Sequence, residues 1–73
     1  MSDLTVVHGD AVYTDLPKRM SALDARVLVR QAGLGDYADS FEPRAGATRV
    51  IWAREPSGAQ LDRLAQRLED SDD

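Results

Sequence analysis

The sequence predicts a small α+β domain of two layers, in which a small three-stranded, mainly antiparallel sheet packs against helices in the order β-β-α-(short α)-β-α. Three observations carry this prediction: two short β-favouring runs separated by a glycine, a third β-favouring run at 48–53, and a helical apolar repeat at 58–69. With 73 residues, 42% of them hydrophobic, the chain suits one core. We expect a single domain over residues 1–68 and an acidic flexible tail over residues 69–73.

The first predicted element is a hairpin formed by residues 4–7 and 11–14. Its turn centres on His8-Gly9 or on Gly9-Asp10, and both registers group the same side chains on each face. The expected core face has Leu4, Val6, Ala11 and Tyr13. The opposite face has Thr5, Val7 and Val12, so it keeps two valines that the core does not need.

A helix over about residues 18–32 follows, for which Ser21 is a suitable N-terminal cap and Gly33 a suitable end. Three of its apolar side chains fall within one narrow stripe at helical spacing: Met20, Leu23 and Val27. This stripe is predicted to pack on the sheet. Val29 lies almost opposite the stripe, where a helix with one buried face would expose it.

The second half of the chain predicts a short helix, a strand and a longer helix. Gly35-Asp36 favours the start of a short helix that reaches Phe41 and ends before Pro43. The strand at 48–53 is apolar on both sides, with Ile51 on its back. Ser57 and Gln60, three positions apart, form a capping box for a helix over about 58–69. Its apolar repeat consists of Leu61, Leu64, Ala65 and Leu68.

Residue types that carry catalysis or bind metals are scarce. Because the chain has no cysteine and one histidine, disulfide, thiolate and structural zinc chemistry are excluded. His8 near Asp10 is the one spot that suggests acid–base chemistry, but a turn explains the pair and no serine motif accompanies it. Asp36 and Asp39 lack further oxygen ligands. We expect no enzyme, no cofactor and no metal.

The apolar runs are too short for a membrane span. The longest ones, residues 50–53 and 27–29, fall far below the roughly 20 residues that cross a bilayer. The N-terminal residues lack the basic and apolar regions of a signal peptide. We therefore expect a cytoplasmic protein with no membrane contact.

Size and surplus apolar residues favour association with a protein partner. A domain this small seldom gains more than roughly 3–5 kcal/mol from its core, and small domains commonly add disulfides, metals or association. The apolar residues left over after one core is filled are Val7, Val12, Val29 and Ile51. The predicted function is a non-enzymatic protein-interaction or regulatory domain, with a homodimer as one form of it. The competing interpretation is that scattered surface valines have no role.

The alternative function is a nucleic-acid-binding transcriptional regulator with an arginine-rich surface. Guanidinium groups bind phosphate well. The candidate residues are Arg26, Arg30, Arg44, Arg49 and Arg54. Residues 32–41 have the length of a helix-turn-helix joint, although Asp39 and Glu42 would repel phosphates. The same stretch resembles the first helix junction of sterile alpha motif interaction domains, whose all-helical fold does not accommodate the flanking strands.

Overall fold

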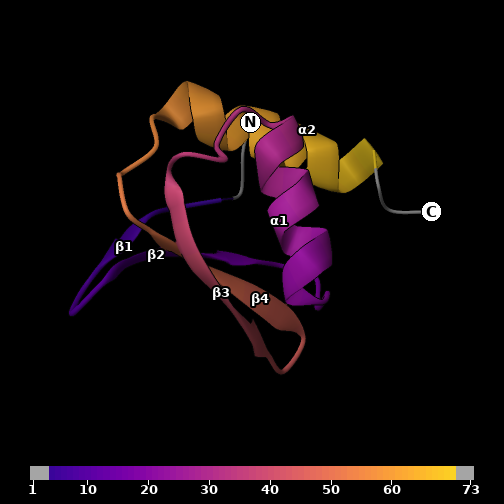
Figure 1. Cartoon of the computed structure of the whole chain (residues 1–73), viewed down its shortest axis with the longest axis horizontal. Helices are drawn as coiled ribbons and strands as arrows, with labels where there is room; N and C mark the ends of the chain where they lie inside the picture. The colour runs from indigo at the N-terminus through magenta and orange to yellow at the C-terminus, as the bar shows by residue number, and fades with distance from the viewer. Residues whose placement is uncertain (1–3, 71–73) are drawn as a thin grey trace.

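The computed structural model describes residues 4–70, which form four strands and two helices. In chain order these are β1 (Val7–His8), β2 (Val12–Leu16), α1 (Ala22–Gln31), β3 (Ala38–Arg44), β4 (Ala47–Trp52) and α2 (Gly58–Asp70). The sheet order is β1-β2-β4-β3, and every neighbouring pair is antiparallel. Figure 1 shows both helices on one side of this sheet, so the predicted α+β class with two layers is confirmed.

The predicted short helix is wrong, because residues 38–44 form strand β3 and raise the number of strands within residues 4–70 to four. Only a single turn follows Gly33, in which Tyr37 and Ala38 donate backbone hydrogen bonds to the carbonyl oxygen of Leu34. The chain then extends and pairs with β4 through a tight turn at Gly46, which has a φ of 69°. Pro43 is tolerated inside β3 because β3 is an edge strand.

The N-terminal hairpin exists, but its register differs from both predicted registers. Val7 lies opposite Tyr13 and His8 lies opposite Val12, so the loop between the strands has three residues. A shift of one residue moves side chains to the other face of a strand. Tyr13 therefore lies on the face away from the helices, whereas Val12 packs against the core. The predicted core position of Tyr13 and the predicted outer position of Val12 are both wrong.

Helix α1 packs on the sheet with a side that the sequence pattern did not predict. Its buried residues are Ala25, Leu28 and Val29, and Ala32 continues the same side just past the helix. Val29 is 1% exposed, whereas Leu23 is 70% exposed. The predicted orientation of α1 is therefore wrong. The hydroxyl of buried Thr48 fixes the start of the helix, because it accepts a hydrogen bond from the Met20 N–H and donates one to the Lys18 carbonyl, both at 2.9 Å.

The predicted helix caps are confirmed, although α1 begins at Ala22 rather than near residue 18. The Ser21 hydroxyl accepts a hydrogen bond of 3.1 Å from the Asp24 N–H at the start of α1. At its end, Gly33 has a φ of 82° and the Leu34 N–H bonds the Val29 carbonyl at 2.9 Å, the pattern of a Schellman motif. The capping box of α2 also forms. The Gln60 side-chain oxygen accepts a hydrogen bond from the Ser57 N–H, and the Ser57 hydroxyl accepts one from the Gln60 N–H. Helix α2 includes Glu69 and Asp70, and the rest of the predicted acidic tail lies outside the described residues.

The core lies between the inner face of the sheet and the two helices. Its largest fully buried side chains include Leu16, Leu34, Leu64 and Val50. A buried polar contact lies at its sheet side: the indole N–H of Trp52 on β4 donates a 2.8 Å hydrogen bond to the hydroxyl of Thr14 on the neighbouring strand β2. This bond satisfies an indole N–H that would otherwise be buried without a partner.

We expect Leu28→Ala to destabilise the protein by about 2–5 kcal/mol, because it leaves a cavity in the core. Leu23→Ala in the same helix is the matched control, and it should change stability by less than about 0.5 kcal/mol because the side chain is exposed. Urea denaturation of both variants measures the difference. Equal losses would contradict the observed orientation of α1.

Thr14→Val should lower the free energy of unfolding by about 1–3 kcal/mol, since it leaves the Trp52 N–H buried without an acceptor. The substitution keeps the side-chain shape, so a cavity does not account for the loss. Urea denaturation followed by tryptophan fluorescence measures it. A variant as stable as the parent would show that water satisfies the indole instead.

Candidate functional site

The four residues predicted to bind a partner do not form one surface. Val7, 41% exposed, and half-buried Ile51 lie on the outer face of the sheet, the face away from the helices. Val12 is half-buried and packs against the core. Val29 is buried in the core, so its predicted exposure is wrong. Two of the four residues therefore remain on the surface, and both belong to the sheet.

Polar contacts cover much of the outer face of the sheet. Tyr13 lies between Val7 and Ile51 in the strand register, and the Arg49 guanidinium lies 4.0 Å from the centre of its ring. Arg49 also donates hydrogen bonds of 2.9 and 3.3 Å to the carboxylate of Asp15. These hydrogen bonds raise the pKa of Arg49 above its ordinary value. The Tyr13 ring on the outer face is thus covered by the Arg49 guanidinium, whose charge is paired with Asp15, and the face is not a bare apolar patch.

The exposed apolar surface lies instead on α1. Leu23 is 70% exposed and Val27 is 46% exposed, and they are four residues apart, so they lie one above the other on the solvent side of the helix. Among the described residues, the large hydrophobic side chains that are exposed are these two and Val7. We call Leu23 and Val27 the α1 ridge. The sequence pattern grouped these two side chains correctly and gave them the wrong side of the helix.

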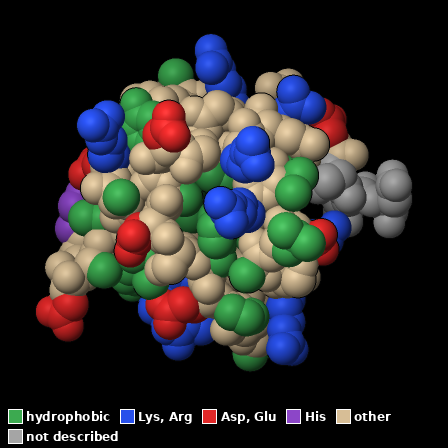
Figure 2. Space-filling view, viewed as in Figure 1, with side chains coloured by type: hydrophobic (Ala, Val, Ile, Leu, Met, Phe, Trp, Pro, Cys, Tyr) green, Lys and Arg blue, Asp and Glu red, His purple; other side chains and the backbone are tan. Residues whose placement is uncertain are grey.

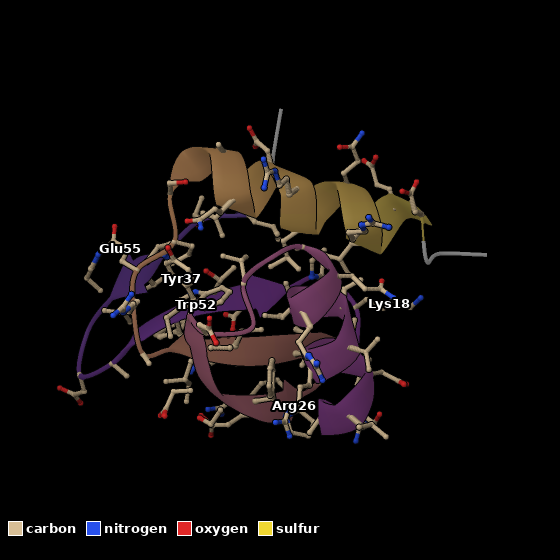
Figure 3. All side chains as sticks on the ribbon, turned by 45° about the horizontal axis from the view of Figure 1, so that its top comes forward. Lys18, Arg26, Tyr37, Trp52 and Glu55 are labelled. Atoms are coloured by element: carbon tan, nitrogen blue, oxygen red, sulfur yellow. The ribbon has the colours of Figure 1, made fainter. Side chains whose placement is uncertain are left out.

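Hollows lie on both sides of this ridge. The larger, with a volume of about 740 Å³, lies between α1 and β3, and we call it the α1–β3 groove. Its lining includes Leu23, Arg26, Arg30, Asp36, Asp39 and Phe41. A smaller hollow of about 440 Å³ lies on the other side of α1 against residues 18–20. Figure 2 has the same view as Figure 1, in which α1 and β3 lie in front. It shows apolar side chains at the surface beside Lys and Arg side chains. Figure 3 shows Lys18 and Arg26 on opposite sides of α1.

Charged groups around the ridge differ from those on the sheet. On the sheet, Arg49 pairs with Asp15, and Arg44 pairs with Glu42 at 3.5 Å. Within residues 4–70, the guanidinium groups of Arg26 and Arg30 form no ion pair. The surface of α1 therefore combines exposed apolar side chains with two arginines that form no ion pair among the described residues.

The five arginines predicted for nucleic-acid binding are divided between different surfaces. Arg26 and Arg30 line the α1–β3 groove, whereas the strand register places Arg44 and Arg49 on the outer face of the sheet. Arg54 follows β4, where its backbone N–H bonds the Tyr37 carbonyl. The helix-turn-helix interpretation of residues 32–41 is wrong, and so is the implied helix junction of a sterile alpha motif, because β3 begins at residue 38.

The structure also shows the surroundings of His8, the residue considered for acid–base chemistry. His8 does not turn toward Asp10; its Nε2 lies 2.5 Å from a carboxylate oxygen of Glu55, and both side chains are exposed. Glu55 is 47 residues away in sequence, so no local pattern could have indicated this pair. In the part of the chain that the structure describes, no group of three or more acidic or histidine side chains could hold a metal ion. Neither described helix has the length and apolarity needed to cross a bilayer.

Comparisons of the chain with protein families, with curated proteins and with solved structures find no match. The geometry of the α1 surface is therefore the basis for assigning a function.

Asp15→Ala should lower the free energy of unfolding only slightly, because both partners of the Asp15–Arg49 pair reach solvent. The loss should shrink further in 1 M NaCl, where salt screens exposed charges. Urea denaturation at low and high salt measures both effects. A loss as large as that expected for Leu28→Ala, and not reduced by salt, would show that this pair is not a surface contact.

Proposed function

We propose that this chain is a non-enzymatic protein-interaction domain that binds its partner through the α1 ridge and the hollows beside it. The observation that carries the proposal is the exposure of Leu23 and Val27, which are 70% and 46% accessible at adjacent positions on one helix. The proposal keeps the function expected from the sequence and moves the surface from the sheet to α1. The proposal keeps the cytoplasmic location expected from the sequence.

The energetics of burial support a protein partner. Full burial of a leucine or valine side chain stabilises a complex by about 1.5–3 kcal/mol before the costs of association. Because Leu23 and Val27 contribute little to the core, this free energy is available to binding. Helix α1 has apolar side chains on two sides: one side is buried in the core of the domain, and the exposed side is free to be buried in an interface.

Nucleic-acid binding is the weaker candidate on electrostatic grounds. Phosphate binding requires several basic groups on one surface. Two of the five candidate arginines, Arg44 and Arg49, are paired with carboxylates on the sheet. The two on α1 flank exposed apolar side chains, which phosphates do not contact favourably.

The proposal is tested by capture from an extract of the native source. Leu23→Gln/Val27→Gln makes the ridge polar, keeps good helix-forming residues and leaves the charge unchanged. The wild-type chain should retain a protein partner at 0.5 M NaCl, and the double variant should lose it, because apolar contacts are insensitive to salt. A dimer of the purified chain that the same double variant dissociates would be the homodimeric form of this result.

Ala59→Gln, at an exposed position of α2, is the matched control and should retain the partner. Equal retention by the wild type and the double variant contradicts the proposal. So does retention of nucleic acid alone, with binding that falls steeply as salt is added.

A further inference from the structure

The two walls of the α1–β3 groove have charges of opposite sign. Arg26 and Arg30 lie one turn apart on the α1 wall, whereas Asp36 and Asp39 lie on the wall formed by the start of β3 and the turn before it. Within residues 4–70, none of these four side chains has an ion-pair partner. The groove therefore has a basic side and an acidic side, and these two sides form no ion pair with each other within the described chain.

Apolar side chains line the groove together with these charged ones. Half-buried Phe41 and Ala38 line it from β3, and Leu23 lines it from α1 with most of its surface exposed. A complementary ligand is therefore amphipathic: it has an apolar line that contacts Leu23, Ala38 and Phe41, and charges of opposite sign on its two flanks.

The form of β3 favours a helical ligand over an added strand. Strand β3 is at the edge of the sheet, where a partner strand could pair with it. Two features oppose such pairing: Pro43 lacks a donor N–H, and the register shifts between Ala38 and Ser40. An amphipathic helix needs no backbone pairing, and it presents apolar and charged side chains in the required rows.

We propose that the α1–β3 groove binds an amphipathic helix of a partner protein, with the acidic flank of that helix beside Arg26 and Arg30 and its basic flank beside Asp36 and Asp39. This inference rests on the proposed function and adds the chemistry of the partner. Exposed ion pairs contribute modestly to affinity, so the opposite charges of the walls set the orientation and selectivity of binding, and the apolar line supplies most of the affinity.

The test uses three fluorescein-labelled helical peptides of about five turns, each with leucines at i, i+3, i+4 and i+7. One has glutamates on one flank and lysines on the other, the second has glutamates on both flanks, and the third has lysines on both. Fluorescence anisotropy at low salt should show that the first peptide binds at least about fivefold more tightly than the other two. In 1 M NaCl this preference should largely disappear.

Reversal of one wall should change which peptide binds best. Arg26→Glu/Arg30→Glu makes both walls acidic, so the lysine-flanked peptide should become the tightest ligand. Asp36→Lys/Asp39→Lys makes both walls basic, so the glutamate-flanked peptide should become the tightest. Arg63→Glu/Arg67→Glu, an exposed pair of arginines at the same spacing on α2, is the matched control and should keep the wild-type preference. Circular dichroism checks that each variant is folded.

The inference is overturned if the three peptides bind with equal affinity, if none binds, or if wall reversal leaves the preference unchanged. A 20-base-pair DNA duplex that binds the wild type and is lost with Arg26→Glu/Arg30→Glu would also overturn it. If the peptides fail but Leu23→Gln/Val27→Gln still releases a captured protein, the proposed function stands without this ligand. If both experiments fail, the proposed function fails as well.

Discussion

The packing of the core determines which side of α1 is buried and which apolar side chains stay exposed. One core cluster joins the inner face of the four-stranded sheet, leucines of α2, Leu34 and one side of α1, so α1 buries only that side. That side is lined partly by the small residues Ala25 and Ala32, which let the helix lie close to its neighbours. The second apolar side of α1 is therefore left in solvent. The exposed Leu23 and Val27 follow from how the core is filled, and they are not isolated surface residues.

The same arrangement separates two kinds of charged surface. On the outer face of the sheet, cross-strand neighbours are of opposite charge, so Arg49 is held by Asp15 and lies over Tyr13. The arginines of this face therefore have paired charges without a binding partner. Around α1, Arg26 and Arg30 line one groove with Asp36 and Asp39, and none of these four side chains forms an ion pair among the described residues. This difference in ion pairing adds to the exposure of Leu23 and Val27 as a reason to propose binding at α1 rather than at the sheet.

Local patterns predicted the α+β class, the position of both helices and their caps, because capping and apolar repeats depend on residues within one or two turns. The strand at 38–44 was missed, because Pro43 argues against a strand unless it lies at a sheet edge, and edge position depends on the whole fold. The side of α1 that is buried was also missed. Ala25, Leu28, Val29 and Ala32 follow the spacing i, i+3, i+4, i+7, and this second repeat was the available indication. Choosing between two repeats on one helix requires knowledge of what α2 already covers.

The orientation of α1 is the central claim, and solvent accessibility of its methyl groups tests it most directly. Methyl NMR spectra of the intact chain are recorded with and without a soluble, neutral gadolinium chelate, which broadens resonances that solvent reaches. We predict strong broadening for Leu23 and Val27 and protection for Leu28 and Val29. Protection of Leu23 and Val27 together with broadening of Val29 would place the opposite side of α1 on the sheet, and the binding surface assigned to this helix would not exist.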